Sequence, residues 1–169
     1  MKSFYSLFFT GIIFFPYSSM KAQTACNLLL LTLPEYYSWK VEHTTTEEYY
    51  SSHYTAYAVS DSVSSVKSSP ILDFSVNTMP LEHTYTAPEK IVENIYTIIC
   101  HYDKKATLTL VKKEEKSTTK NYFYALSGEK TTLLLFYKTI HTCFYSAEIE
   151  VPNLILEKIS IEEWGDIFF

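Results

Sequence analysis

A block of aromatic side chains with a carboxylate beside it is the part of this 169-residue sequence best suited to chemistry. Seven Tyr and Trp residues fall between positions 36 and 57, namely Tyr36, Tyr37, Trp39, Tyr49, Tyr50, Tyr54 and Tyr57. Aromatic faces attract organic cations, and a carboxylate can pair with an ammonium group. The block therefore predicts a site for a small organic amine. The competing interpretation is the packed core of an aromatic β protein.

Four residues are the candidates for binding this amine. Tyr50 and Tyr54 are an even number of positions apart, so on a strand they lie on one face. Glu48 falls on that same face, and Trp39 comes earlier in the chain. We expect the three rings to hold the organic part of the ligand and Glu48 to pair with its ammonium group.

Motifs for catalysis or for a bound cofactor are missing from the sequence. The five His residues are scattered, and three Gly residues are too few for a glycine-built phosphate cradle. Adjacent acids such as Glu114 and Glu115 point to opposite faces of a strand, which argues against paired-carboxylate chemistry. We expect a binding protein without a cofactor or metal, not an enzyme.

The first twenty-two residues have the layout of a secretory signal peptide. Lys2 precedes an apolar run over residues 4–15, Pro16 follows the run, and small residues lead up to Ala22. The run is too short to span a bilayer, which needs about 20 apolar residues. The sequence predicts a signal peptide over residues 1–22 and one exported, extracellular domain over residues 23–169 with no membrane span.

Three cysteines belong to the mature chain, and export favours a disulfide. Cys26 lies next to the expected cleavage region, so we predict a bridge between Cys100 and Cys143. Cys26 then remains as a free thiol or pairs between chains. A metal site built from Cys100, Cys143, His101 and His141 lacks the usual C-x-x-C spacing, which favours the disulfide.

The charge of the chain restricts its partners. The net charge is −5, and no Arg occurs in the sequence. Nucleic-acid binding depends largely on Arg and Lys contacts to phosphates, so we expect no nucleic-acid partner. We expect instead a monomer whose partner is a small organic molecule, either a biogenic amine or a lipid.

The second half of the chain has the pattern of an antiparallel β meander. β-branched and aromatic residues over 91–102 predict a strand, and the alternation of residues 106–111 predicts another. Residues 112–120 form a charged turn, and strands are expected over 121–126, 131–140 and 143–151. A short helix is expected near the N-terminus, with Thr44 to Thr46 as its cap and Glu47-Glu48 in its first turn. Closure of the strands into a barrel would hide the sheet edges.

Short motifs in the chain resemble the salivary lipocalins of blood-feeding ticks. Trp39-Lys40-Val41 and the Tyr-rich stretch of residues 48–57, which ends near Asp61, resemble the opening of that family. Residues 133–144, which end in Thr142-Cys143-Phe144, resemble a later strand of the family. The family normally has a C-E-L-W element after that strand, and the nearest match here has Ile161 in place of the cysteine. The resemblance implies a mainly β, lipocalin-like barrel that sequesters histamine, serotonin or a lipid mediator without turning it over.

A secreted β-sandwich that binds another protein is the alternative fold and function. The spacing of Cys26, Trp39 and Cys100 resembles that of an immunoglobulin domain. Ile98, however, stands where such a domain has a Tyr two residues before its second Cys. A barrel should contain a ligand cavity, whereas a sandwich should have a filled core.

Overall fold

The computed structural model describes residues 26–46, 49–59, 69–81 and 87–169. The predicted signal peptide and Glu48 lie outside these residues. The described part of the chain contains seven strands and three helices, in the order β1 (Tyr37–Thr45), β2 (Tyr50–Ala58), β3 (Leu72–Pro80), α1 (Pro88–Tyr102), β4 (Thr107–Glu115), β5 (Thr119–Ser127), β6 (Thr131–Ile140), β7 (Cys143–Pro152), α2 (Asn153–Leu156) and α3 (Ile161–Phe168).

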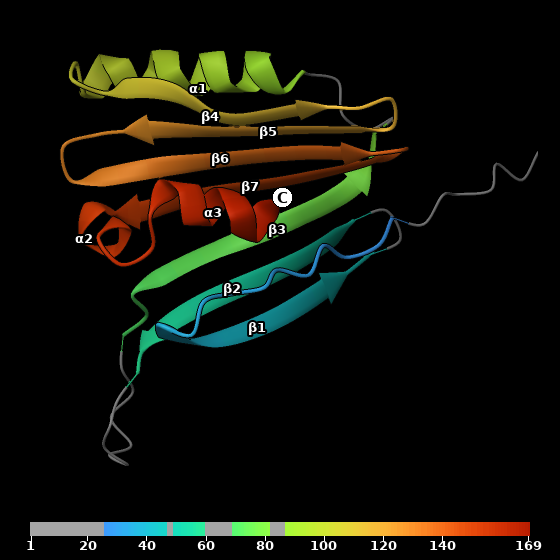
Figure 1. Ribbon diagram of the computed structural model, residues 1–169, viewed down its shortest axis with the longest axis horizontal. Helices are drawn as coiled ribbons and strands as arrows, with labels where there is room; N and C mark the ends of the chain where they lie inside the picture. Colours follow the sequence, from blue (N-terminus) through green and yellow to red (C-terminus); the bar gives the residue numbers. More distant parts are fainter. Residues whose placement is uncertain (1–25, 47–48, 60–68, 82–86) are drawn as a thin grey trace, which may run out of the picture.

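The strands form one antiparallel sheet in the order β1-β2-β3-β7-β6-β5-β4. Strand β3 pairs with the last strand, β7, and not with β4, which is the next strand along the chain. Helix α1 makes the connection from β3 to β4. Figure 1 shows β1 at one edge of the sheet and β4, with α1 beside it, at the other. The predicted mainly β class and the meander from β4 to β7 are confirmed. The described strands leave the sheet open, because β1 and β4 do not pair.

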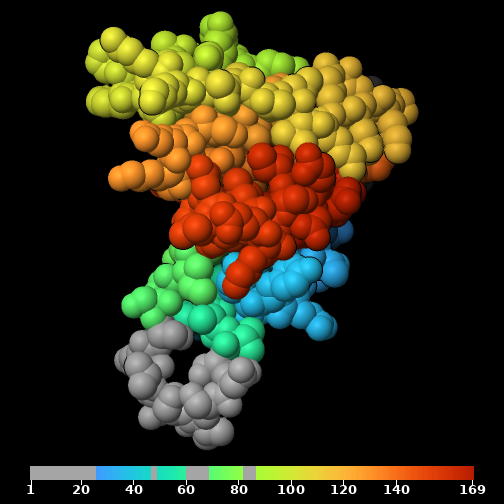
Figure 2. Space-filling view, turned by 60° about the vertical axis from the view of Figure 1, so that its left-hand side comes forward, coloured from blue at the N-terminus to red at the C-terminus, as the bar shows by residue number. Residues whose placement is uncertain are grey.

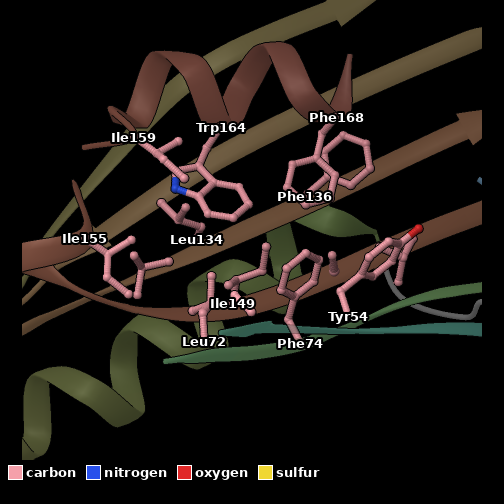
Figure 3. Close-up of a cluster of buried hydrophobic side chains, with 14 of the residues drawn as sticks. Tyr54, Leu72, Phe74, Leu134, Phe136, Ile149, Ile155, Ile159, Trp164 and Phe168 are labelled. Carbon is pink, nitrogen blue, oxygen red and sulfur yellow. The ribbon is translucent and has the colours of Figure 1, made fainter. Parts of the chain in front are cut away.

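The larger hydrophobic core lies between one face of the sheet and helices α2 and α3. Strand alternation places Phe74, Phe123 and Phe136 on this face. Trp164 and Phe168 of α3 point onto these residues, as Figure 3 shows. The C-terminal residues cover the middle of the sheet in Figure 2. This face of the sheet is therefore covered by side chains of the same chain.

Helix α3 begins at a capping box that its sequence encodes. The Ser160 Oγ accepts from the Glu163 N–H at 3.2 Å, and the Glu163 Oε2 accepts from the Ser160 N–H at 2.7 Å. These two bonds satisfy backbone donors that the first turn of a helix leaves without partners. The capping box thereby fixes where the Trp164 side chain meets the sheet.

Replacing Ser160 by Ala is expected to lower the free energy of unfolding by about 1 kcal/mol, because the Glu163 N–H loses its acceptor. Urea unfolding followed by circular dichroism measures the change. Ser38→Ala is the matched control, since Ser38 is exposed on β1. Equal losses in the two variants would contradict the role of the cap.

A second, smaller core lies on the other face of the sheet, beneath α1. Val92 of α1 packs with Tyr122, Leu135, Tyr137 and Phe144. Residues 91–102, which we predicted as a strand, are helical, so that prediction is wrong. Pro88 sits at the start of the helix, where its missing N–H costs nothing, and the apolar residues follow a helical repeat that faces the sheet.

The predicted N-terminal helix is also wrong for the residues that the structure describes. Trp39, Thr44 and Thr45 belong to β1, which pairs with β2 along its whole length. Pairing with β2 gives these backbone groups their hydrogen-bond partners, and β-branched residues suit such a strand.

The disulfide joins Cys26 to Cys143, with their Cα atoms 5.6 Å apart, so the predicted Cys100–Cys143 bridge is wrong. Cys100 is a free thiol, half-buried on α1. Strand alternation explains the difference, because the Cys143 side chain lies on the face opposite α1. The segment 26–34 runs along that same face, where Leu29, Leu31 and Leu33 pack against the larger core.

Candidate functional site

The aromatic residues predicted to bind a ligand lie in or beside the core. Tyr50 and Tyr54 share a face of β2, as predicted. Tyr54 is only 2% exposed and stacks on Phe74 with ring centroids 5.0 Å apart. The Trp39 Nε1–H donates to the Pro34 carbonyl oxygen at 2.9 Å. None of these residues lines either of the two cavities described next.

A cavity of about 490 Å³ lies at the beginning of α1, where the turns β4–β5 and β6–β7 meet. We call it the α1 pocket. It has an apolar part and a polar part, and its lining consists of Leu81, Ala87, Pro88, Glu89, Glu115, Ser117, Thr118, Lys120, Tyr122, Thr139, His141 and Phe144. A cavity of about 530 Å³ lies at the other end of α1, beside Asp103 and Gly128. Polar groups converge on one atom in the α1 pocket, which makes it the better candidate.

That atom is the hydroxyl oxygen of Tyr122, a side chain that is 5% exposed. The hydroxyl donates to Glu115 Oε1 at 2.5 Å, and Glu89, which also lines the pocket, is near enough for its negative charge to raise the pKa of the same hydroxyl. Burial raises the pKa of Tyr122, and the negative charges of Glu115 and Glu89 raise it further. The hydroxyl therefore keeps its proton at physiological pH.

The hydrogen bond from Tyr122 also stabilises the charged form of Glu115. It lowers the pKa of the Glu115 carboxyl, and Lys113, whose Nζ lies 3.4 Å from Oε1, lowers it further. Glu115 is thus an anion at the pocket wall. Glu89 comes from the first turn of α1, so a helix and a strand each supply one carboxylate.

One hydroxyl proton cannot satisfy two carboxylates. A Tyr hydroxyl has a single donor, so when Glu115 accepts it, Glu89 faces only oxygen lone pairs. An ammonium group has three N–H donors. Placed in this position, it could donate to Glu89, to Glu115 and to the Tyr122 oxygen together. The arrangement of acceptors is therefore suited to a cation that carries several hydrogens.

The backbone of His141, at the rim of the α1 pocket, has an unusual conformation. Its φ is 52°, the left-handed region that residues other than Gly rarely adopt. His141 occupies the two-residue turn between β6 and β7, and its N–H donates to the Thr118 carbonyl oxygen at 2.8 Å. Cys143, two residues later, is held by the disulfide. Such conformations persist where the surroundings fix them, and they concentrate at functional sites.

The residues of the α1 pocket are not apparent as a group in the sequence. Glu89, Glu115 and Tyr122 are far apart in the chain, and Glu89 precedes a segment that we read as a strand. Had this segment been predicted as a helix that begins at Pro88, Glu89 would have been placed in the first turn of that helix. Which side chains come near Tyr122 depends on the order of the strands in the sheet, and a single sequence does not reveal that order.

Comparisons with known proteins give no indication of the function, so the geometry of the site is the evidence for it. No protein-family model and no curated protein matches the chain. In the part of the chain that the structure describes, no group of three or more His, Cys, Asp or Glu residues could hold a metal ion. Across the same residues, no helix has the length and apolar character needed to cross a membrane.

Proposed function

We propose that this chain is an exported protein that binds a small organic amine in the α1 pocket and does not turn it over. The observation that carries the proposal is the Tyr122 hydroxyl between the carboxylates of Glu115 and Glu89. An ammonium group bound there supplies the donors that the two carboxylates lack.

The remainder of the pocket suits the organic part of such a ligand. Phe144, Pro88 and Leu81 provide an apolar wall next to the polar groups. Ligand pockets of about 300–1,000 Å³ commonly combine an apolar lining with a few directed polar groups. The volume of about 490 Å³ lies within that range.

Export is part of the proposal and is supported by the N-terminal sequence. The apolar run behind Lys2 has the layout of a signal peptide. The disulfide between Cys26 and Cys143 is compatible with an oxidising compartment. In such a compartment the protein would act by depleting its ligand.

The resemblance to tick salivary lipocalins remains a prediction, and it is the source of histamine and serotonin as candidate amines. That family would place the ligand inside a barrel. In this chain the sheet is open, and the face that α2 and α3 cover is filled by Trp164, Phe168 and their neighbours. We therefore place the ligand on the other face, at the start of α1.

Calorimetric titration with phenethylamine, histamine and serotonin tests the proposal. We expect at least one of them to bind, and we expect Glu89→Gln and Glu115→Gln each to weaken that binding about fivefold. The factor is modest because both carboxylates are exposed enough for solvent to screen them.

The matched control is Glu93→Gln on the same helix. Glu93 is exposed and pairs with Lys90 at 3.1 Å, and it does not line the α1 pocket. The proposal fails if none of the three amines binds to folded protein. It also fails if Glu93→Gln weakens binding as much as the two pocket variants do.

A further inference from the structure

We infer that the ligand of the α1 pocket is an amine that also carries a carboxylate, namely a free amino acid with an apolar or aromatic side chain. This inference rests on the proposed function and narrows it. It follows from the charges on the polar side of the pocket, where an available cation stands next to the carboxylates.

The available cation is the ammonium group of Lys120. Lys120 lines the pocket, and its Nζ makes no ion pair within 4.0 Å with any residue that the structure describes. Lys113, by contrast, pairs with Glu115 at 3.4 Å and lies over the Tyr122 ring. Lys113 is therefore paired directly with Glu115. Lys120 acts on Glu115 only through its charge, which helps to lower the pKa of that carboxyl, so its Nζ can still receive a carboxylate from a ligand.

The register of β4 and β5 places opposite charges at the spacing that an amino acid requires. Glu115 lies directly opposite Lys120, so their side chains share a face with Cβ atoms about 5 Å apart. An α-amino acid carries its ammonium and carboxylate on one carbon atom. Its ammonium can lie near Glu115 and Glu89 while its carboxylate lies near Lys120.

Other groups at the rim can also receive a carboxylate. Thr139 lies opposite Lys120 on β6 and offers a hydroxyl, and the imidazole of His141 lines the same side of the pocket. The apolar wall of Leu81, Pro88 and Phe144 remains for the side chain of the amino acid.

The inference is tested by calorimetry on the oxidised, full mature chain. Three ligands are compared, which differ from one another in the charged groups that they carry. L-Phenylalanine has both charges, phenethylamine lacks the carboxylate, and 3-phenylpropionate lacks the ammonium. We expect phenylalanine to bind about tenfold more tightly than phenethylamine, and phenylpropionate to bind least. The tenfold factor corresponds to one hydrogen-bonded ion pair in a partly exposed site.

The variant Lys120→Met should remove the advantage of phenylalanine over phenethylamine, because phenylalanine loses the partner of its carboxylate while phenethylamine, which has only the ammonium, binds at least as tightly as before. Lys116→Met is the matched control, since Lys116 is exposed in the same turn and does not line the pocket. Because Lys120 is exposed, its replacement should not affect folding, which circular dichroism verifies. The ligand comparison on the unaltered protein needs no variant at all.

Each outcome has a distinct meaning. Equal or tighter binding of phenethylamine overturns this inference and leaves the proposed amine function standing. Binding of phenylpropionate alone, or of none of the three together with failure of histamine and serotonin, overturns the proposed function itself. An unchanged advantage of phenylalanine in Lys120→Met overturns the role of Lys120 and, with it, the inference.

Discussion

Replacing both Cys26 and Cys143 by Ser is expected to lower the free energy of unfolding by about 4–5 kcal/mol in the chain-entropy model. The bridge joins residues 117 positions apart, so its removal restores a large amount of freedom to the unfolded chain. A single domain is commonly stable by only 5–15 kcal/mol. The variant should therefore unfold at a much lower urea concentration, measured by circular dichroism and tryptophan fluorescence.

The bridge also holds the segment 26–34 against the core, where Leu29, Leu31 and Leu33 are partly buried. Amide hydrogen exchange of this segment should increase in the double variant more than exchange in β5 and β6. Cys100→Ser is the control, because the Cys100 thiol is free and outside the larger core. Comparable losses in Cys100→Ser and in the double variant would contradict the pairing.

Replacing Trp164 by Ala is expected to cost about 3–5 kcal/mol of stability, the usual range for deleting a large buried aromatic. Trp164 is completely buried and contacts Phe74 edge-on and Phe168 by stacking, at centroid distances of 5.9 and 6.3 Å. It is the side chain through which α3 closes the larger core (Figure 3). Urea unfolding gives the value.

Trp164→Phe should cost much less than Trp164→Ala. The buried Nε1–H of Trp164 makes no hydrogen bond with any described residue, so Phe removes an unsatisfied donor along with part of the ring. Trp39→Phe is the matched comparison, because the Trp39 Nε1–H donates to Pro34. Equal costs for Trp164→Phe and Trp164→Ala would show that the core cannot accept a smaller ring.

The strands that a single sequence predicts well are those with strict alternation and clear turns. The predicted boundaries 131–140 and 143–151 agree closely with β6 and β7. The charged residues 112–115 were assigned to a turn but extend β4, since an edge strand tolerates charge and a bulge. Local pattern was sufficient here because each strand pairs with its neighbour in sequence.

Helix α1 was missed because β-branched residues suggested a strand. Burial against the sheet outweighs this propensity, and the apolar residues Val92 and Ile95 contact Tyr122 and Leu135. The S-x-x-E signal of Ser160 and Glu163 was present in the sequence and would have predicted α3.

The disulfide and the candidate site depend on which face each residue occupies. Cys100 is closer to Cys143 in sequence than Cys26 is, yet the sheet separates α1 from the Cys143 side chain. In the same way, Tyr37, Tyr54 and part of Trp39 from the aromatic block belong to the core that α3 covers, whereas Tyr36 is exposed. Tyr54 is a core residue, as the competing interpretation of the block predicted. The role of Glu48 in binding a ligand remains a prediction.

The neighbouring positions of β3 and β7 determine when this chain can fold. Strands β1 to β3 can form local hairpins, but the inner face of β3 is covered only after β7, α2 and α3 have been synthesised. Contacts between distant segments form slowly, because the entropy of closing the loop is lost before the contacts are gained. The topology thus delays compaction of the sheet until β7, α2 and α3 have been synthesised, and a chain that is still extended is the form that the proposed export through a secretion channel would require.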